Sequence, residues 1–328
     1  MYKALVFLFL FSASYRLAAQ QVPRDTSFSV YSTFIKMKKK YPAITIADPA
    51  TPKNVKIQTG VVYSTVNGRP LVVDVFYPSK KSKIAYPAVL MIHGGGWRSG
   101  DRSHNIPTAK LLAANGYVAV SAEYRLSTEA TYPAAVHDLK TAVRWIRANA
   151  KKYNIDTAKV AAWGCSAGGQ LAALLGTTNG NARLEGQGSY PDYSSNIQAI
   201  VDVDGTLAFI HPESGEGDDS KGKSAATLWF GYSKTERPDL WHEAGALNHV
   251  SQKTPPILFI NSSVDRMHAG REDMIKKLRS WNIYTEVHAF PDAPHPFWLF
   301  NPWFQPTVEH TLSFLNKVFK PTKAPERL

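Results

Sequence analysis

AAWGCSAGGQLAAL, residues 161–174, places one serine among glycines and joins an apolar run to a helix-like run. Gly164 to Gly168 matches the pattern G-x-S-x-G, in which the serine lies on a sharp turn from a strand into a helix. We expect the strand over residues 159–163 and a helix that begins near Gly168. Small residues at both ends of the motif let these two elements cross closely. The motif therefore predicts a nucleophile, Ser166, at a helix N-terminus, where negative charge is stabilised.

The single cysteine of the chain, Cys165, stands beside this serine. Because the flanking glycines are centred on Ser166, we interpret Cys165 as a small, packed side chain inside the turn. A cysteine nucleophile is the alternative. One cysteine cannot form an internal disulfide, and no cluster of cysteines indicates a zinc site. We expect neither a metal nor a cofactor.

A second glycine-rich motif, HGGGW at residues 93–97, ends the apolar run 87–93. Glycines let backbone N–H groups approach a ligand closely. Two or three such donors can stabilise the oxyanion that forms during acyl transfer. A phosphate site is the alternative, but no lysine follows in the P-loop pattern. We expect an oxyanion hole made by the N–H groups of Gly95, Gly96 and Ala167.

Strand-like and helix-like runs alternate along most of the chain. Residues 61–77 read as a β-hairpin, because Asn67-Gly68 supplies the residue pair that a tight turn needs. Later strands are expected over 87–93, 117–124, 159–163, 198–203, 256–261 and 284–290, and helices over 106–116, 133–153, 271–281 and 307–319. This alternation predicts an α/β fold with a mostly parallel, doubly wound sheet of about eight strands. Helices should cover both faces, and the antiparallel hairpin should lie at the N-terminal end.

The chain of 328 residues suits one large α/β domain, which we expect over residues 21–328. Residues 205–250 differ in composition from the rest of the chain. They contain the polar, glycine-rich stretch HPESGEGDDSKGKS at 211–224, which two short helix-like runs follow. We interpret this stretch as an insertion between two sheet strands that caps a site as a lid. A surface excursion is the alternative.

The first twenty residues resemble a targeting segment. They contain an early lysine, an apolar stretch at 4–11, and small residues up to Ala19. This pattern predicts a secretory signal over residues 1–20 and an exported protein, secreted or periplasmic. A membrane anchor is the alternative, but Arg16 interrupts the apolar run. We expect no anchor after cleavage.

The chain is basic, with a formal net charge of +12. A basic protein can bind nucleic acid, an anionic lipid surface or an acidic polysaccharide, and a solvated surface is the alternative. The run KMKKK, residues 36–40, is expected to end a short helix, and no nucleic-acid-binding motif accompanies it. We therefore expect no nucleic-acid partner.

A serine nucleophile needs a histidine that accepts its proton and a carboxylate that orients the histidine. Where the serine lies on such a turn, the chain order is Ser, then Asp or Glu, then His. Asp265 follows the expected strand 256–261, and His295 follows the last expected strand. Both fall in loops at the carboxyl ends of strands, where sites form on open α/β sheets. We therefore predict a triad of Ser166, Asp265 and His295. The rival candidates for the base, His268 and His288, and for the acid, Asp273 and Asp292, are less favourably placed.

The joint pattern of HGGGW, AEYRLS, YPAAVHDLKTAVRWIRANAKKYNID, GCSAGG and the late Asp and His loops resembles the α/β-hydrolase fold, in its hormone-sensitive-lipase-like branch. The resemblance runs from about Val61 to Phe319. Within this branch the chain is most similar to bacterial carbohydrate esterases of xylan and pectin. The loop NSSVDRMHAG lacks the proline-containing D-x-x-V pattern that is usual at the acid.

The resemblance implies a serine carboxylesterase that removes ester groups from a plant cell-wall polysaccharide or oligosaccharide. Acetyl is the ester group that we expect before the others. Pectin methylesterase and feruloyl esterase are the nearest alternatives. A small-ester esterase or lipase, a serine peptidase and a non-catalytic binding protein on the same fold also remain open. The positive charge slightly favours pectin over neutral xylan.

Aromatic residues crowd the two loops that carry the expected oxyanion hole and the histidine. Aromatic faces can stack on sugar rings or on a feruloyl group. Packing of the last loop against the final helix is the alternative. The expected substrate-binding residues are Trp97, Trp298 and Trp303.

Overall fold

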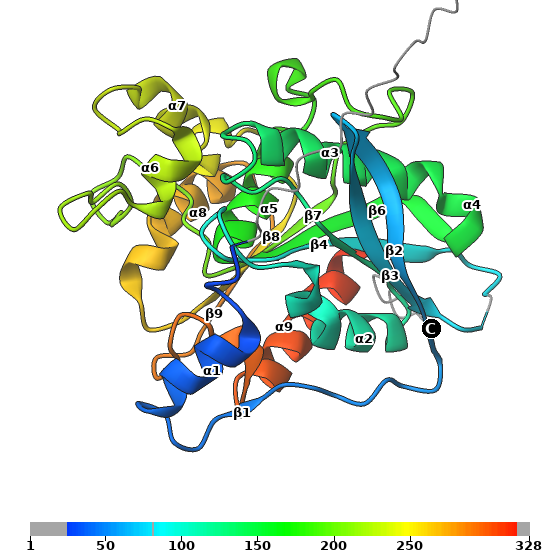
Figure 1. The fold of residues 1–328 in the computed structure, drawn as a ribbon. Helices are drawn as coiled ribbons and strands as arrows, with labels where there is room; N and C mark the ends of the chain where they lie inside the picture. Colours follow the sequence, from blue (N-terminus) through cyan, green and yellow to red (C-terminus); the bar gives the residue numbers. More distant parts are fainter. Residues whose placement is uncertain (1–24, 81, 320–328) are drawn as a thin grey trace, which may run out of the picture.

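The structure, a computed structural model, describes residues 25–80 and 82–319. An eight-stranded sheet forms its centre (Figure 1). In sheet order the strands are β2 (Val55–Val66), β3 (Arg69–Pro78), β5 (Val118–Ala122), β4 (Tyr86–Ile92), β6 (Ile155–Cys165), β7 (Ala199–Val203), β8 (Ile257–Asn261) and β9 (Thr285–Ala289). The signal predicted over residues 1–20 lies outside the described residues.

The strands from β5 to β9 are all parallel, whereas β2, β3 and β5 pair antiparallel. The predicted hairpin is β2–β3, and its turn residues Asn67 and Gly68 both have positive φ, at 49° and 79°. Asparagine and glycine tolerate this conformation best, which explains why the chain reverses here. The predicted mostly parallel, doubly wound fold is confirmed.

Helices cover both faces of the sheet (Figure 1). One core lies between the sheet and three helices, α3 (Ala134–Ala148), α5 (Ala167–Thr177) and α8 (Arg271–Ser280). The core on the other face lies beneath α1 (Val30–Lys38), α2 (Ile106–Ala114) and α9 (Phe304–Phe319). Along β4, Leu90 faces the first core and Val89 the second, as alternation along a strand requires. Both faces of the strand are apolar, which is the pattern of a buried parallel sheet.

The helix expected over 133–153 is divided. α3 ends at Ala148, and a separate turn, α4 (Ala150–Tyr153), follows Asn149. Asn154 then adopts the left-handed conformation, with φ at 56°, which ends the helix and starts β6. The apolar periodicity of the sequence continues across Asn149, so the periodicity alone predicted one helix where the structure has two.

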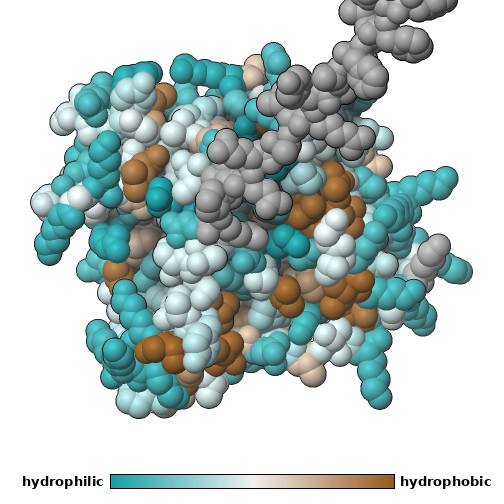
Figure 2. Space-filling view, viewed as in Figure 1, coloured by the Kyte–Doolittle hydropathy of each residue, from teal (hydrophilic) through white to brown (hydrophobic). Residues whose placement is uncertain are grey.

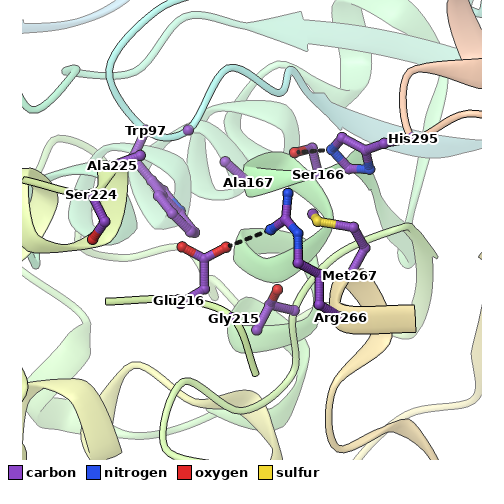
Figure 3. Close-up of a pocket in the computed structure, with 12 residues that line it drawn as sticks. Trp97, Ser166, Ala167, Gly215, Glu216, Ser224, Ala225, Arg266, Met267 and His295 are labelled. Atoms are coloured by element: carbon purple, nitrogen blue, oxygen red, sulfur yellow. Dashed lines mark hydrogen bonds and ion pairs between the residues drawn. The ribbon is translucent and has the colours of Figure 1, made fainter. Parts of the chain in front are cut away.

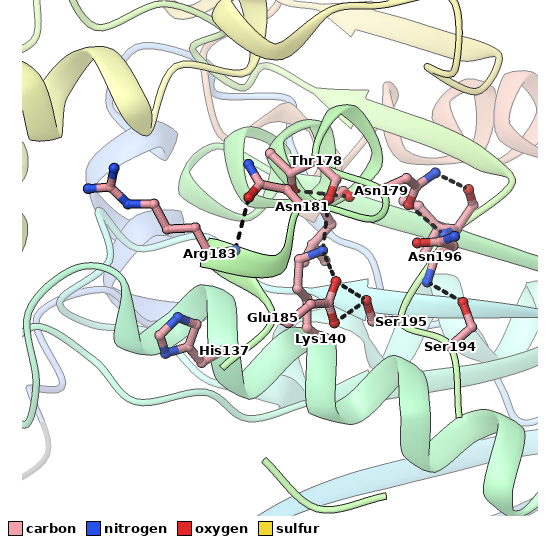
Figure 4. A network of polar contacts seen from close by, with 12 residues as sticks. His137, Lys140, Thr178, Asn179, Asn181, Arg183, Glu185, Ser194, Ser195 and Asn196 are labelled. Atoms are coloured by element: carbon pink, nitrogen blue, oxygen red, sulfur yellow. Dashed lines mark hydrogen bonds and ion pairs between the residues drawn. The ribbon is translucent and has the colours of Figure 1, made fainter. Parts of the chain in front are cut away.

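A buried polar network joins α3 to the connection between α5 and β7 (Figure 4). The ammonium of Lys140, on α3, is fully buried and donates to the Glu185 carboxylate at 2.9 Å and to the Thr178 carbonyl at 3.1 Å. The Ser195 hydroxyl donates to the same carboxylate at 2.7 Å. Because each charged group has partners, the network fixes the long connection that leads into β7.

Residues 205–250 lie between β7 and β8 and contain the two expected short helices, α6 (Ala225–Phe230) and α7 (Pro238–Glu243). Figure 1 places both on the same side of the sheet as α8. Trp229 of α6 is fully buried and stacks on Trp97, with ring centroids 4.8 Å apart. The insertion is therefore packed onto the domain beside the HGGGW loop.

On the face shown in Figure 2, hydrophobic residues form separate patches between hydrophilic ones. Across residues 25–80 and 82–319, no helix combines the length and the apolar character that crossing a membrane requires.

Candidate active site

Ser166 occupies the turn between β6 and α5, with φ at 55° and ψ at −124°. A positive φ is strained for a residue with a side chain, and it lifts the hydroxyl away from the sheet. The turn is possible because its flanks lack side chains. A Cβ on Gly164 would lie 2.0 Å from the Gly168 carbonyl oxygen, and one on Gly168 would lie 2.2 Å from the Ile92 carbonyl oxygen. The predicted close crossing of strand and helix is confirmed.

His295 lies in the loop after β9 and contacts the nucleophile directly. Its Nε2 is 2.8 Å from the Ser166 hydroxyl oxygen (Figure 3). The hydroxyl donates to Nε2 when the imidazole is neutral, which is the arrangement a general base needs. The indole of Trp298 meets the imidazole edge-on, with centroids 5.2 Å apart, and supports the ring from one side. The predicted pairing of Ser166 with His295 matches this geometry.

The carboxylate on the other side of the imidazole belongs to Asp204. Its Oδ2 accepts a hydrogen bond from His295 Nδ1 at 2.9 Å, and its side chain is fully buried. Its Oδ1 accepts from the Ser262 backbone N–H at 2.8 Å. The Asp204 backbone N–H donates to the Ile260 carbonyl at 2.9 Å. The carboxylate is therefore held between the ends of β7 and β8, aimed at the histidine.

The prediction of Asp265 as the acid is wrong. Asp265 begins the short 3₁₀-helix η4 (Asp265–His268), and its side chain is fully exposed. The ring of His268 is its nearest ionic partner, at 3.9 Å. The loop after β8 turns this carboxylate to solvent. The two residues that follow Asp265, Arg266 and Met267, line the cavity that contains Ser166 and His295.

A signal for Asp204 was present in the sequence. Asp204-Gly205 follows directly on the strand expected over 198–203, and Asp204 satisfies the chain order Ser, Asp, His. Asp265 comes four residues after β8 ends at Asn261. Each extra loop residue gives the chain more freedom to direct a side chain away from the strand end. The distance from the strand end therefore favoured Asp204.

Cys165 is fully buried as the last residue of β6. Its Sγ lies 4.0 Å from the Ile92 carbonyl oxygen and does not line the cavity that contains Ser166. Burial raises the pKa of the thiol well above its usual value. Because the thiolate is the nucleophilic form, this cysteine fits a packing role rather than catalysis.

A cavity of about 290 Å³ opens onto Ser166 and His295 (Figure 3). Gly96 and Ala167 line it, and their backbone N–H groups meet no acceptor among the described residues. Two such donors beside the nucleophile suit an oxyanion. The third predicted member, Gly95, does not line the cavity. Its carbonyl accepts from the Ser99 N–H at 3.0 Å, which closes the turn of the HGGGW loop.

The three predicted tryptophans separate into two groups. Trp97 lines the cavity, and its Nε1 donates to Gln170 at 2.9 Å. Trp298 and Trp303 do not line it, so their assignment to substrate binding is wrong. Both are buried, and Trp303 packs edge-on against Tyr41 of the N-terminal segment, with centroids 5.7 Å apart. That segment covers the loop after His295, which the sequence did not reveal.

The insertion at 205–250 forms one wall of the cavity. It contributes five lining residues, Thr206, Gly215, Glu216, Ser224 and Ala225. The other walls come from the HGGGW loop, the serine turn, η4 and the histidine loop. Within residues 25–80 and 82–319, no group of three or more His, Cys, Asp or Glu is arranged to hold a metal ion.

Comparisons with known proteins agree with this architecture. The model of the BD-FAE family matches residues 73–272. Esterase LipC of Mycobacterium tuberculosis is 28% identical over 246 residues, which cover 71% of this chain and 59% of LipC. A solved structure described as a bifunctional GH43-CE protein of Bacteroides eggerthii is 25% identical, with a TM-score of 0.68, and the match covers 80% of this chain and 38% of that one.

A truncated carbohydrate esterase from gut microbiota has the same fold, with a TM-score of 0.68 and 22% identity over 82% of this chain and 99% of that one. The chain spans 59% of LipC and 38% of the GH43-CE protein.

Proposed function

Because this chain belongs to the BD-FAE family of α/β-hydrolases, in the hormone-sensitive-lipase-like branch, we propose that it is a serine carboxylesterase. One observation carries the proposal. Ser166, His295 and Asp204 are joined by two hydrogen bonds, of 2.8 Å and 2.9 Å, and Ser166 and His295 line a cavity. A nucleophile, a base and a buried acid in this order define the machinery of acyl transfer.

The geometry supports a two-step reaction. His295 Nε2 takes the proton from the Ser166 hydroxyl as its oxygen attacks the ester carbonyl carbon. Asp204 holds the Nδ1 proton and stabilises the imidazolium. The N–H groups of Gly96 and Ala167 donate to the oxyanion. The imidazolium then protonates the leaving alkoxide, and an acyl group remains on Ser166. Water, activated by the same imidazole, attacks the acyl carbon and releases the acid.

The substrate we propose is an acetylated plant cell-wall polysaccharide, such as pectin or xylan, or an oligosaccharide derived from one. The cavity of about 290 Å³ is at the small end of ligand pockets, which suits a short acyl group. Its lining includes polar side chains, among them Glu216 and Ser224, which suit a hydroxylated partner better than a lipid tail. The likeness to the GH43-CE protein also supports a carbohydrate substrate.

Export completes the proposal. The lysine, apolar stretch and small residues of positions 1–20 support a cleaved signal, which would bring the enzyme to extracellular polysaccharide. Mass spectrometry of the protein recovered from the periplasm or medium tests this, with an N-terminus at residues 20–22 expected.

The test of the activity is proton NMR of the small molecules released from pectin and from acetylated, feruloylated xylan. Acetate, methanol and ferulate give separate signals, so one experiment distinguishes the three esters. We expect the wild type to release acetate and Ser166→Ala to release none. Release of methanol or ferulate alone would replace the acetyl assignment. Activity on phenyl acetate without release of acetate, methanol or ferulate from either polymer would overturn the polysaccharide assignment. The proposed esterase activity would remain.

A further inference from the structure

Two oppositely charged side chains face the nucleophile across the cavity, and the proposed reaction uses neither. Glu216 comes from the insertion after β7, and Arg266 comes from η4 after β8. Figure 3 shows the Arg266 guanidinium extending into the cavity between Glu216 and Met267, toward Ser166. Charged groups at this position can contact the parts of the substrate that are bonded to the ester group.

The Glu216 carboxylate is mostly buried and lacks a full set of hydrogen-bond donors. Its side chain is 13% exposed, and its ion pair with Arg266 Nη1 spans 3.6 Å. Charge-assisted hydrogen bonds are shorter, at about 2.7–2.9 Å. No described residue donates a hydrogen bond to this carboxylate, and burial raises its pKa. A buried acceptor of this kind is stabilised when a ligand supplies a donor.

Arg266 has the complementary capacity. Its side chain is about half exposed, and the long contact with Glu216 is its one ion pair among the described residues. A guanidinium carries five N–H donors in a planar fork, so the single long contact with Glu216 leaves most of them available to a ligand. The two side chains together offer a strong acceptor and several donors within one wall.

This combination fits hydroxyl groups better than it fits an anion. A hydroxyl donates one hydrogen bond and accepts others, so adjacent hydroxyls can satisfy both side chains at once. A carboxylate bound to Arg266 would lie beside the negative Glu216, which opposes it. The basic character of the whole chain is therefore not reproduced in this wall of the cavity, where the two charges balance.

We propose that Glu216 and Arg266 are specificity-determining residues that bind the hydroxyl groups of a neutral sugar ring on the alcohol side of the ester. The inference rests on the proposed function. An acetyl group has no hydroxyl, so the groups that reach this pair must belong to the alcohol. The sugar ring is then held with its ester oxygen toward His295, and neutral xylan-type esters are preferred over uronate esters.

Steady-state kinetics on three esters test the proposal. The substrates are a monoacetylated methyl xyloside, a monoacetylated methyl galacturonoside and phenyl acetate, which has no hydroxyl. The variants are Glu216→Gln and Arg266→Gln, with Asp218→Asn as the control. Asp218 is an exposed residue of the same loop, is not among the lining residues, and loses the same charge in its variant.

Both cavity variants should lower kcat/KM on the xyloside by about tenfold to a hundredfold, mainly through KM, because a hydrogen bond to a charged group is lost. Phenyl acetate turnover should change by less than about threefold, as should every activity of the control. Glu216→Gln should also shift the preference between the two sugars toward the galacturonoside, because the opposing charge is gone.

Equal losses on xyloside and phenyl acetate would overturn the inference, since they would mean a general defect of the site. So would unchanged xyloside kinetics in both variants, or a wild-type preference for the galacturonoside. These outcomes leave the proposed esterase intact. Failure of the wild type on all three esters would instead remove the proposed function, and a wild type active on phenyl acetate alone would remove the sugar substrate and this inference together.

Discussion

Two neighbouring loops, after β7 and after β8, each carry an aspartate near the strand end. One of these side chains is buried in the active site, and the other is exposed to solvent. Asp204 is fully buried and accepts from His295 at 2.9 Å. Asp265 is fully exposed, and its one ionic partner among the described residues is His268, at 3.9 Å. The residue type and the sheet edge are the same. The difference lies in how the backbone leaves each strand.

β7 is the direct neighbour of β6, which carries Ser166, and β8 is one strand further. The turn after β7 packs tightly on α5, since a Cβ on Gly205 would lie 2.3 Å from the backbone nitrogen of Gln170. This contact leaves Asp204 no freedom to turn outward. The loop after β8 is longer and directs Arg266 and Met267 into the cavity. One loop therefore completes the proposed triad, and the other shapes what enters the site.

The strongest way to break this contrast is Asp204→Asn. Asparagine keeps the shape of the side chain but can present its amide to Nδ1 and favour the wrong imidazole tautomer. The expected loss in kcat on phenyl acetate is about 10⁴-fold, as for the equivalent change in other triads. Stopped or discontinuous assays with matched protein concentrations measure it. A loss below about tenfold, with an unchanged melting temperature, would show that Asp204 does not orient His295.

The tight packing beneath Asp204 is tested by Gly205→Ala. The added Cβ would meet the Asp202 carboxylate and the backbone nitrogen of Gln170, each at 2.3 Å. Backbone must move, so we expect a loss of about 1–3 kcal/mol in unfolding free energy. Urea unfolding measures this loss. Gly245→Ala is the matched control, because its nearest obstacle is the Asn248 side chain, which can rotate. Similar stabilities for the two variants would mean that the turn after β7 tolerates movement.

Much of this architecture was predictable from the sequence, because strand and helix periodicity reports burial. The hairpin turn at Asn67-Gly68, the serine turn and the short helices after β7 follow from local patterns and lie as expected. His295 was also found, since it follows the last strand of the sheet. These features depend on residues close together in the chain.

Features that depend on distant contacts were missed. The direction of Asp265 is set by the path of η4, and its distance from the end of β8 was the one local sign that it could turn away. The burial of Trp303 results from Tyr41, more than 250 positions earlier in the chain. Gly95 has the residue type of an oxyanion donor, but the path of its loop leaves it outside the lining of the cavity that contains Ser166. A motif therefore indicates which groups are available, and packing decides which of them face the site.

Strand β7 contains a second contrast, because Asp202 lies two residues before Asp204. Asp202 is fully buried, and its Oδ1 accepts from the Gly205 N–H at 2.9 Å. Burial, and then the nearby Asp204 charge, raise the pKa of Asp202 well above its usual value, against smaller lowering effects of the Gly205 N–H and then of Arg271. The native protein thus keeps a proton that the unfolded chain releases above about pH 4. Stability should fall as the pH rises through this window.

Asp202→Asn removes this dependence. The variant should gain stability relative to the wild type as the pH rises above about 4, by at most about 1.4 kcal/mol per pH unit, until native Asp202 itself ionises. Urea midpoints between pH 4 and 8 measure the difference. The exposed Asp192→Asn should show no such trend. A difference that stays constant with pH would mean that Asp202 ionises alike in the folded and unfolded chains.

The smallest expected effect belongs to Asp265→Asn, and it is the most direct test of the opening contrast. The carboxylate is exposed and makes no hydrogen bond among the described residues, so kcat and KM on phenyl acetate should change by less than about twofold. The variant is also combined with Asp204→Asn. If Asp265 took over when Asp204 is lost, the double variant would fall well below Asp204→Asn alone. Because the Asp265 carboxylate is fully exposed and directed to solvent, it cannot replace Asp204 at His295 Nδ1, and we expect the double variant to match Asp204→Asn alone.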